Sequence, residues 1–314
     1  MSGEMEFTHK PVLLAECVEG LNIKPGGVYV DGTLGRAGHS RAIAERLTTG
    51  RLICIDRDQA ALAAAPARLA GLMDHVTLLH GNFADLEALL SPLHLPGVDG
   101  MLFDLGVSSP QLDDASRGFS YLSDAPLDMR MDRDDTLTAR TVVNEWPQEE
   151  LRRILSQYGE ERYAPAIAAA IVRARGRASI ETTLELVDII KSAMPSQALR
   201  EKQHPAKRSF QAIRIAVNDE LTAVERVLRQ AVPLLNPGGR LCVISFHSLE
   251  DRIVKNTLAE FARGCTCPPD FPVCVCGKKP QVRLVSRKPI VSSPQELEEN
   301  PRARSAKLRV AEKL

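Results

Sequence analysis

The amino-acid sequence predicts a doubly wound, Rossmann-like α/β sheet with an all-helical domain inserted into it. Over residues 28–104, short runs rich in Val, Ile and Leu alternate with helix-like runs, which is typical of parallel strands joined by helical crossovers. After Gly106 the alternation stops, and the next buried strand-like run is 240–246. One crossover needs only about a dozen residues, so most of the intervening segment is predicted to form a separate insertion.

Four parallel strands are predicted in the first part of the chain, each of them a short apolar run that ends at a polar residue. They are Val28–Asp31, Arg51–Asp56, Val76–His80 and Val98–Asp104. Helices are expected over residues 40–47 and 59–70, and a fifth strand over 240–246. Near the end of the chain, residues 282–285 and 307–310 are β-like and are expected to pair as a hairpin that closes the sheet.

The inserted segment is expected to be helical. Predicted helices cover residues 148–158, 166–175 and 183–194, and an interrupted helical run over 208–232 leads back to the sheet. Pro147 suits a first helical turn, Gly159 and Gly176 suit helix ends, and Thr183 is expected to cap the third helix. We therefore divide the chain into residues 1–112, the first part of the sheet domain, 113–207, the inserted helical domain, and 208–314, the second part of the sheet domain.

The composition predicts a folded protein without bulk affinity for nucleic acid. Of 314 residues, 44% are hydrophobic, which excludes a largely disordered chain, and 40 Lys+Arg balance 40 Asp+Glu. The resulting net charge of zero is an average over the chain. Residues 99–135 hold nine Asp against three Arg, while residues 278–314 hold ten Lys or Arg against four Glu. A second basic cluster lies within 200–214. Some of the acidic side chains are expected to pair with basic ones in the fold, so recognition of RNA would depend on shape and placement.

The sequence also predicts a cytoplasmic protein with no membrane partner. Its first residues lack the basic and apolar regions of a signal peptide, and no apolar run approaches the roughly 20 residues of a membrane span. The cysteines are therefore expected to stay reduced. Four of them, Cys265, Cys267, Cys274 and Cys276, are close in sequence and could form a zinc site. The C-x-C spacing is tight for one, however, and we expect no metal.

Three motifs at the ends of successive strands indicate a ligand site. Residues 31–39, Asp-Gly-Thr-Leu-Gly-Arg-Ala-Gly-His, form a glycine-bearing turn before a helix, where the backbone can approach a ligand closely. Asp56 could accept both ribose hydroxyls of an adenosine ligand, and the ring of Phe83 could flank an adenine. A plain turn, a helix cap and a core ring are the ordinary alternatives, but all three motifs lie where open α/β sheets bind ligands. The absence of G-x-G-x-x-G disfavours a nicotinamide oxidoreductase.

Longer strings make the chain similar to a known family. They are residues 31–40, 104–113 (Asp-Leu-Gly-Val-Ser-Ser-Pro-Gln-Leu-Asp), 126–131, 245–252 and 300–305. Together they resemble motifs of the MraW/RsmH family over nearly the whole chain. The resemblance implies a methyltransferase that uses S-adenosylmethionine and modifies N4 of a cytosine in the decoding centre of 16S rRNA, within the small ribosomal subunit. It leaves self-association open, with a homodimer as one assembly.

The resemblance also implies which residues hold the cofactor. They are Ala37, Gly38, His39, Asp56, Phe83, Asp104 and Gln111. Family members often carry Gly where this chain has Ala37, and a methyl group fits there if φ is negative. His39 and His247 have no companions at metal-ligand spacing and are predicted to be hydrogen-bonded structural residues. Ser248 and Asp251 resemble a capping box that opens a helix.

The implied reaction requires positioning more than acid–base catalysis. The exocyclic amine of cytosine is a poor nucleophile because its lone pair is delocalised, so an acceptor for its protons would favour attack on the sulfonium methyl group. Ser108, Ser109 and Pro110 form the predicted positioning loop, since related amino-methyltransferases place a proline-containing tetrapeptide there. Candidates for the acceptor are a backbone carbonyl of Ser108 or Ser109 and the carboxylate of Asp104 or Asp113.

Two other functions stay open on the sequence alone. The same cofactor fold could methylate a different RNA base or a protein amide. Alternatively, an assembly factor could keep the fold and bind the small subunit without turnover, although the intact Asp56, Asp104 and Gln111 argue against this.

Overall fold

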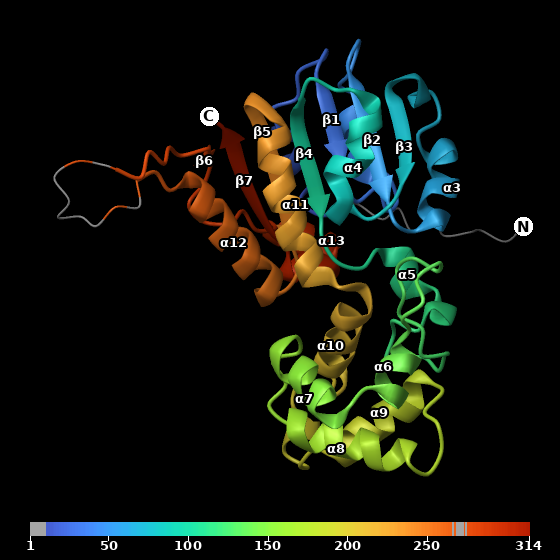
Figure 1. The fold of residues 1–314 in the computed structure, drawn as a ribbon. Coiled ribbons are helices and arrows are strands. Elements are labelled where there is room, and N and C mark those ends of the chain that lie inside the picture. Colours follow the sequence, from blue (N-terminus) through green and yellow to red (C-terminus); the bar gives the residue numbers. More distant parts are fainter. Residues whose placement is uncertain (1–10, 266, 268–272, 274) are drawn as a thin grey trace, which may run out of the picture. The chain divides into compact units, whose positions relative to one another are not determined.

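The computed structural model describes residues 11–265, 267, 273 and 275–314. The chain divides into two units. The sheet unit consists of Met1–Gly106 and Leu221–Leu314, and the helical unit is Val107–Glu220 (Figure 1). The domain limits proposed from the sequence, at residues 112 and 207, stay a prediction.

The sheet unit is built on a mixed sheet whose first five strands are parallel. In the described part of the chain its strands are β1 (Val28–Asp31), β2 (Arg51–Asp56), β3 (Val76–His80), β4 (Val98–Asp104), β5 (Leu235–Ser245), β6 (Val282–Leu284) and β7 (Lys307–Lys313). Their order is β3-β2-β1-β4-β5-β7-β6. The chain starts in the middle, runs outward to β3 and then returns to β4 on the other side of β1, so the predicted doubly wound fold is confirmed.

Helices cover both faces of this sheet. They are α1 (Leu14–Leu21), α2 (Gly38–Ala44), α3 (Gln59–Arg68), α4 (Leu86–Leu90), α11 (Glu220–Leu234), α12 (Ser248–Ala262) and α13 (Pro294–Glu299). Alternate residues of a strand point to opposite faces, and β2 shows this directly. Leu52 and Cys54 pack with residues of α1, α2 and α3, whereas Ile53 and Ile55 pack with residues of α4, α11 and α12. Burial on both faces explains why these strands are continuous apolar runs in the sequence.

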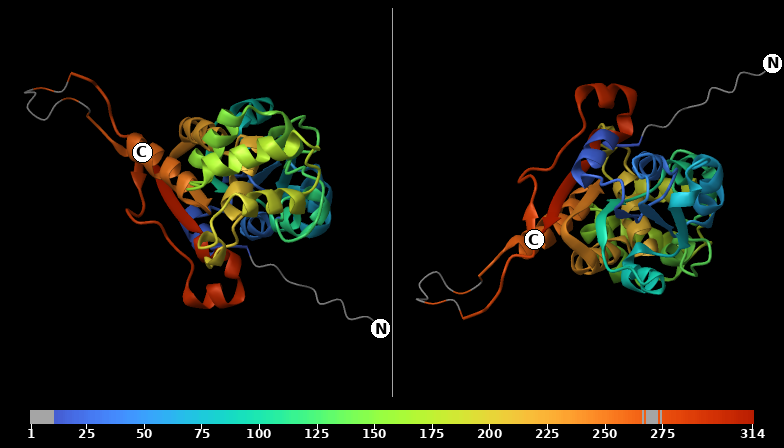
Figure 2. Two further views of the ribbon diagram at one scale, coloured as in Figure 1. Left: turned by 90° about the horizontal axis from the view of Figure 1, so that it is seen from below. Right: turned by 90° about the horizontal axis from the view of Figure 1, so that it is seen from above.

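The C-terminal part of the sheet confirms the predicted hairpin-like pair. β7 runs antiparallel to both β5 and β6, with Cys242 opposite Val310 and Val282 opposite Lys313. In both views of Figure 2, the described residues that follow α12 and those that precede β6 run side by side away from the sheet. This exposed segment carries three of the described cysteines.

One predicted helix cap in the sheet unit is wrong by one residue. The N-cap of α12 is His247, whose ring accepts the N–H of Glu250, and Glu250 in turn accepts the N–H of His247. Ser248 is therefore the first residue inside the helix. Asp251 is not part of the cap, because its carboxylate pairs with Arg309 at 2.7 Å and with Lys307 at 3.2 Å.

The helical unit encloses a hydrophobic core of its own. Its helices in the described residues are α5 (Ser109–Asp113), α6 (Ala139–Glu145), α7 (Gln148–Gln157), α8 (Ala164–Arg175), α9 (Thr183–Ser192) and α10 (Lys207–Asn218). Leu151, Ile167, Leu186 and Ile213 from four of these helices are buried in that core. The predicted interruption is confirmed, since the backbone is left-handed at Asp219, between α10 and α11.

Two local expectations for the helical unit need correction. The N-cap of α9 is Thr182, whose hydroxyl accepts the N–H of Glu185, and Thr183 is inside the helix. The stretch expected to be a loop after β4 contains the short helix α5. The expected pairing of acidic side chains is found at Asp128, whose two carboxylate oxygens bind Arg130 at 2.7 and 2.8 Å. None of the helices in the described part of the chain has both the length and the hydropathy that crossing a membrane requires.

Candidate cofactor site at the carboxyl ends of the strands

Three aspartates mark one edge of the sheet. Asp31, Asp56 and Asp104 are the last residues of β1, β2 and β4, which are neighbours in the order β2-β1-β4. The three strands are parallel, so their carboxyl ends meet at the same edge. The sequence motifs predicted from separate segments are therefore brought together by the topology.

Asp31 is the most buried of the three and supports the first turn. One oxygen accepts the hydroxyl of Ser40 at 2.5 Å, and the other accepts the N–H of Thr33 at 3.1 Å. Burial raises the pKa of this carboxyl, and the hydrogen bond from Ser40 opposes the shift. Both partners belong to the turn and the helix that follows it, so Asp31 is a structural residue that supports the site.

Asp56 joins the first turn to the end of β2. Its Oδ2 accepts the N–H of Gly35 at 2.8 Å, and its Oδ1 accepts the N–H of Asp58 at 2.8 Å. Burial raises the pKa of Asp56 to about 6, while these two backbone hydrogen bonds oppose the shift. Each carboxylate oxygen has a second acceptor position, so the group can still bind two hydroxyls of a ligand.

Asp104 carries an unsatisfied acceptor. Its Oδ1 is buried and has no hydrogen-bond partner among the described residues, while its Oδ2 lies 3.8 Å from Nδ1 of His39. Burial raises the pKa of Asp104 to about 6, and His39 opposes the shift. A buried carboxylate oxygen without a donor is costly unless a ligand supplies one. Asp104 therefore points to a bound group that donates hydrogen bonds.

His39 is held in place by its other ring nitrogen. Nε2 lies 3.0 Å from the carbonyl oxygen of Val12, and because a carbonyl can only accept, Nε2 carries the proton. The ring is buried at the first turn of α2. These contacts agree with the predicted hydrogen-bonded role of His39, and the N-cap of α12 gives the same result for His247.

The backbone of the first turn is left-handed at Ala37. Its φ is +58°, so the condition under which a methyl group would fit there without strain, a negative φ, is not met. A residue with a Cβ is strained there by about 1–2 kcal/mol, which explains why glycine suits the position. At the next residue a side chain is excluded for another reason, because a Cβ on Gly38 would lie 2.2 Å from Cγ of Pro11. The backbone of the turn at Gly38 thus packs directly against the ring of Pro11.

Phe83 lies beyond the end of β3, the strand next to β2. Its ring packs edge-on against the buried Phe103, with centroids 5.8 Å apart, and it remains partly exposed. The prediction that this ring borders an adenine and the alternative of a core phenylalanine are both compatible with half-burial. The position follows from the capping of the short turn by Asn82, whose side chain accepts the N–H of Ala84.

The remaining predicted residues belong to the helical unit. Ser108 is the N-cap of α5, Ser109 and Pro110 follow inside the helix, and the side chain of Gln111 accepts the N–H of Ser108 at 3.1 Å. Ser109 and Gln111 are buried. The carbonyl of Ser108 accepts the N–H of Leu112 at 3.2 Å. The predicted positioning loop is thus a helix start whose geometry is fixed by proline and by a local cap.

The electrostatics of the sheet edge favour a cationic ligand. Asp31 raises the pKa of both Asp56 and Asp104, because like charges near one another oppose ionisation. His39 is the cation-forming group that opposes the shifts at Asp31 and Asp104. A ligand with positive charge would relieve this repulsion, and a neutral or anionic one would not.

The whole chain matches one protein family. A model described as the MraW methylase family matches residues 6–314. The chain belongs to this family. As a member it is a methyltransferase that uses S-adenosylmethionine, and the predicted family, enzyme class and cofactor are confirmed.

Similar proteins carry a more specific name. The chain is 60% identical to a ribosomal RNA small subunit methyltransferase H of Paenibacillus sp. (strain JDR-2), with 98% of this chain and 100% of that protein covered. A protein of the same name from Brevibacillus brevis is 57% identical, with 99% of each chain covered. Among solved structures, an rRNA methylase from Streptococcus thermophilus shows 12% identity and a TM-score of 0.41 over 98% of both chains, which is a distant likeness.

The structure of this MraW methylase also shows supporting residues that sequence reasoning did not name. The hydroxyl of Thr33 accepts the N–H of Asp104 at 2.7 Å and so links the first turn to the end of β4. The guanidinium of Arg68 donates to the carbonyl of Gly35 at 3.1 Å from α3. Asp31 was available as a signal, since it ends its strand as Asp56 and Asp104 do. Arg68 had none, because its contact depends on how α3 packs.

Proposed function

We propose that this MraW methylase transfers the methyl group of S-adenosylmethionine to the exocyclic N4 of one cytosine in the decoding centre of 16S rRNA, with the small ribosomal subunit as its partner. The single observation that carries the proposal is the orphaned Oδ1 of Asp104 among three strand-end carboxylates. The names of the relatives support the substrate, since both are small-subunit rRNA methyltransferases. A cytoplasmic location and self-association as a homodimer are the accompanying predictions.

The residues at the sheet edge fit the cofactor. When bound, S-adenosylmethionine supplies a methyl group on a positively charged sulfonium, beside a charged amino group. Oδ1 of Asp104 would accept from that amino group, and Asp56 would accept the two ribose hydroxyls with its remaining lone pairs. Ala37, Gly38 and His39 would border the ligand from the first turn, and Phe83 would flank the adenine. Gln111 is a further proposed contact with the cofactor.

Positioning of the cytosine amine is assigned to Ser108, Ser109 and Pro110. Pro110 fixes the backbone at the start of α5, and the Gln111 side chain holds the N–H of Ser108. A rigid backbone can orient a weak nucleophile without a basic side chain, which is most of what this displacement needs. Acceptors for the amine protons remain the carbonyls of Ser108 and Ser109 and the carboxylates of Asp104 and Asp113.

Contacts with RNA are expected from exposed basic residues outside the cofactor site. Arg200, Lys202 and Lys207 in the helical unit are exposed, whereas Arg214 is used internally, pairing with Glu220 at 2.7 and 2.8 Å. A target base must be splayed out of its stack to reach a methyl donor at a sheet edge. A net charge of zero fits placement on a structured particle better than tight binding to any RNA.

The test supplies tritiated methyl donor and a choice of substrates. Small subunits and naked 16S rRNA from a strain that lacks the enzyme are incubated with the purified protein, and the labelled nucleoside is identified. We expect label on N4-methylcytidine at one position. Label on another base or on protein supports the alternative acceptor, and binding to subunits without label supports the assembly factor; either result would overturn the proposal.

A further inference from the structure

A cluster of thiols lies outside the residues assigned to the cofactor site. Cys265, Cys267 and Cys276 lie in the exposed segment between α12 and β6, and their three sulfur atoms are all within 4.8 Å of one another. Two of these side chains are exposed and the third is half-buried. Cys274, the fourth cysteine of the sequence motif, lies outside the described residues, and the inference does not depend on it.

The sulfur spacing matches a metal site better than a disulfide. Sγ of Cys276 and Sγ of Cys265 are 3.7 Å apart, far more than the S–S bond length of about 2.0 Å. In a tetrahedral zinc site with Zn–S bonds of about 2.3 Å, neighbouring sulfurs are about 3.8 Å apart. The observed distance is therefore that of two thiolates on one zinc ion.

The backbone answers the objection that C-x-C is too tight. The N–H of Cys267 donates to Sγ of Cys265 at 3.4 Å, so the two residues form a small turn around the first sulfur. Directly after Cys276 the chain reverses at Gly277, whose φ of +62° is left-handed. Both turns bring the sulfurs inward instead of spreading them.

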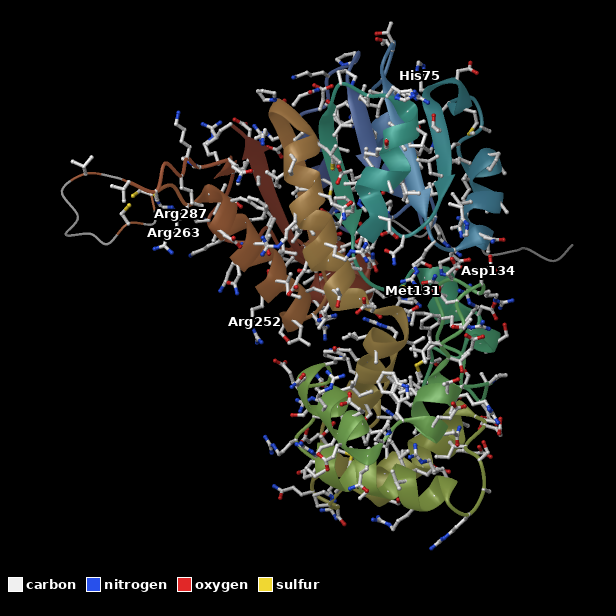
Figure 3. The ribbon with its side chains drawn as sticks, in the orientation of Figure 1. His75, Met131, Asp134, Arg252, Arg263 and Arg287 are labelled. Carbon is white, nitrogen blue, oxygen red and sulfur yellow. The ribbon has the colours of Figure 1, made fainter. Side chains whose placement is uncertain are left out.

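Nothing else in the described residues explains why this segment holds a shape. Val273 and Val275 are 70% and 73% exposed, and none of the residues of 263–280 that the structure describes belongs to a buried cluster of the sheet unit. A segment without a core is ordinarily stabilised by disulfides or by a metal. Its flanks are basic: Arg263, Lys278 and Lys279 lie beside the cysteines in sequence, and Figure 3 places Arg263 and Arg287 near the start of the segment. Positive flanks offset the negative charge of a zinc–thiolate centre.

We propose that Cys265, Cys267 and Cys276 bind one Zn²⁺ as thiolates, with a fourth ligand from outside this trio. Each thiol releases its proton to solvent on binding, and no electron is transferred. Thiolate ligands and tetrahedral spacing select zinc over calcium or magnesium, which take oxygen ligands. The ion ties the residues after α12 to those before β6, so its role is structural and separate from the cofactor site.

The experiment measures metal in the full chain. The protein is expressed with added zinc, purified under reducing conditions and desalted, and its zinc content is determined by mass spectrometry. We expect about one zinc per chain, and at least about tenfold less in Cys265→Ser and Cys276→Ser. Val275→Ser is the matched control, because it changes an exposed side chain of the same segment, keeps every thiol and should keep the zinc.

Two further measurements keep the inference testable if a variant fails to fold. Replacing zinc by Co²⁺ in the unaltered protein should give the visible and near-ultraviolet absorption bands of tetrahedral cobalt–thiolate. The intact mass, measured under non-reducing conditions, should show no loss of the two hydrogens that a disulfide bond removes. A chain without zinc and without those bands overturns the proposal. So does a disulfide between these cysteines in the reduced preparation, or zinc that persists in both serine variants.

Discussion

The cofactor edge and the cysteine segment belong to the same sheet unit but obtain their shape in opposite ways. At the cofactor edge, Asp31, Asp56 and Asp104 end apolar strands, and hydrogen bonds to Gly35, Asp58 and Thr33 fix the turns. In the cysteine segment, exposed valines and basic residues are sequence neighbours of three thiols, and the sequence offers no apolar pattern. The shape of the cofactor edge is therefore fixed by strands buried in the core, whereas the shape of the cysteine segment depends on a few polar atoms.

This difference determines what each region can do. A turn anchored on buried strands holds a carboxylate within tenths of an ångström, which binding and positioning of a cofactor require. It also retains a cost, since burial, and to a smaller extent the nearby Asp31, raises the pKa of Asp56 and of Asp104. A segment without a core has no such rigidity and gains it from a ligand. Substitutions should therefore affect the two regions independently, because they share no partner among the described residues.

The largest effect is expected at Asp56. Replacing it with asparagine in Asp56→Asn removes the charge and at least one acceptor, and hydrogen bonds to a charged group contribute about 1.5–3 kcal/mol each. The Kd for S-adenosylmethionine, measured by isothermal titration calorimetry, should rise about a hundredfold. Asp99→Asn is the control, since Asp99 accepts the N–H of Val28 at the opposite end of the strands. Equal affinities in the two variants would refute the ribose assignment.

A somewhat smaller effect is expected at Gly38, this time on stability. In Gly38→Ala the new Cβ would lie 2.2 Å from the Pro11 ring, and relief of such a clash typically costs about 1–3 kcal/mol. The free energy of unfolding, from urea titration, should fall by about 2 kcal/mol. The neighbouring change Ala37→Gly should alter it by less than about 1 kcal/mol, because relief of the positive φ is offset by loss of a buried methyl group. A stable Gly38→Ala protein would show that the Pro11 segment can move away.

How far the sequence could predict these features depended on their physical origin. Strands β1, β2 and β4 and the acids that end them were predictable, because a parallel strand buried on both faces leaves a continuous apolar run. The sign of φ at Ala37 was not predictable, because neither the glycine that is common in the family nor the alanine of this chain fixes the backbone conformation at that position. Helix caps shifted by one residue at Thr182 and His247, where adjacent residues could cap equally well. Helix α5 was too short for a periodic signal.

The effect of pH on cofactor binding should be smaller than the effects of the substitutions at Asp56 and Gly38. Burial raises the pKa of Asp56 and of Asp104 to about 6, so both carboxylates lose their charge as the pH falls below that value. Affinity for the cationic cofactor should therefore drop at least about tenfold between pH 7 and pH 5. The contribution of these two groups to the stability of the ligand-free fold has the opposite sign. A raised carboxyl pKa favours the protonated folded state, so that contribution grows as the pH falls from about 6 toward the unfolded value near 4.

The two pH dependences are measured separately. Calorimetry gives the affinity for the cofactor at each pH, and urea unfolding gives the stability of the ligand-free protein. Asp104→Asn removes one titrating group and should flatten the pH dependence of the Kd. A Kd that stays constant from pH 7 to pH 5 in the unaltered protein would contradict the acidic site. Loss of affinity that merely follows unfolding of the protein at low pH would contradict it as well, since stability and affinity are expected to move in opposite directions.

The smallest effect on the cofactor edge should come from stripping the cysteine segment of metal. After treatment with a strong chelator, limited proteolysis should cleave between α12 and β6 much faster, because without zinc nothing in the described residues holds that stretch together. The Kd for S-adenosylmethionine should change by less than about twofold, because the two regions share no partner among the described residues. If affinity instead falls along with zinc content, the two regions are coupled, and the metal belongs to the machinery of methyl transfer.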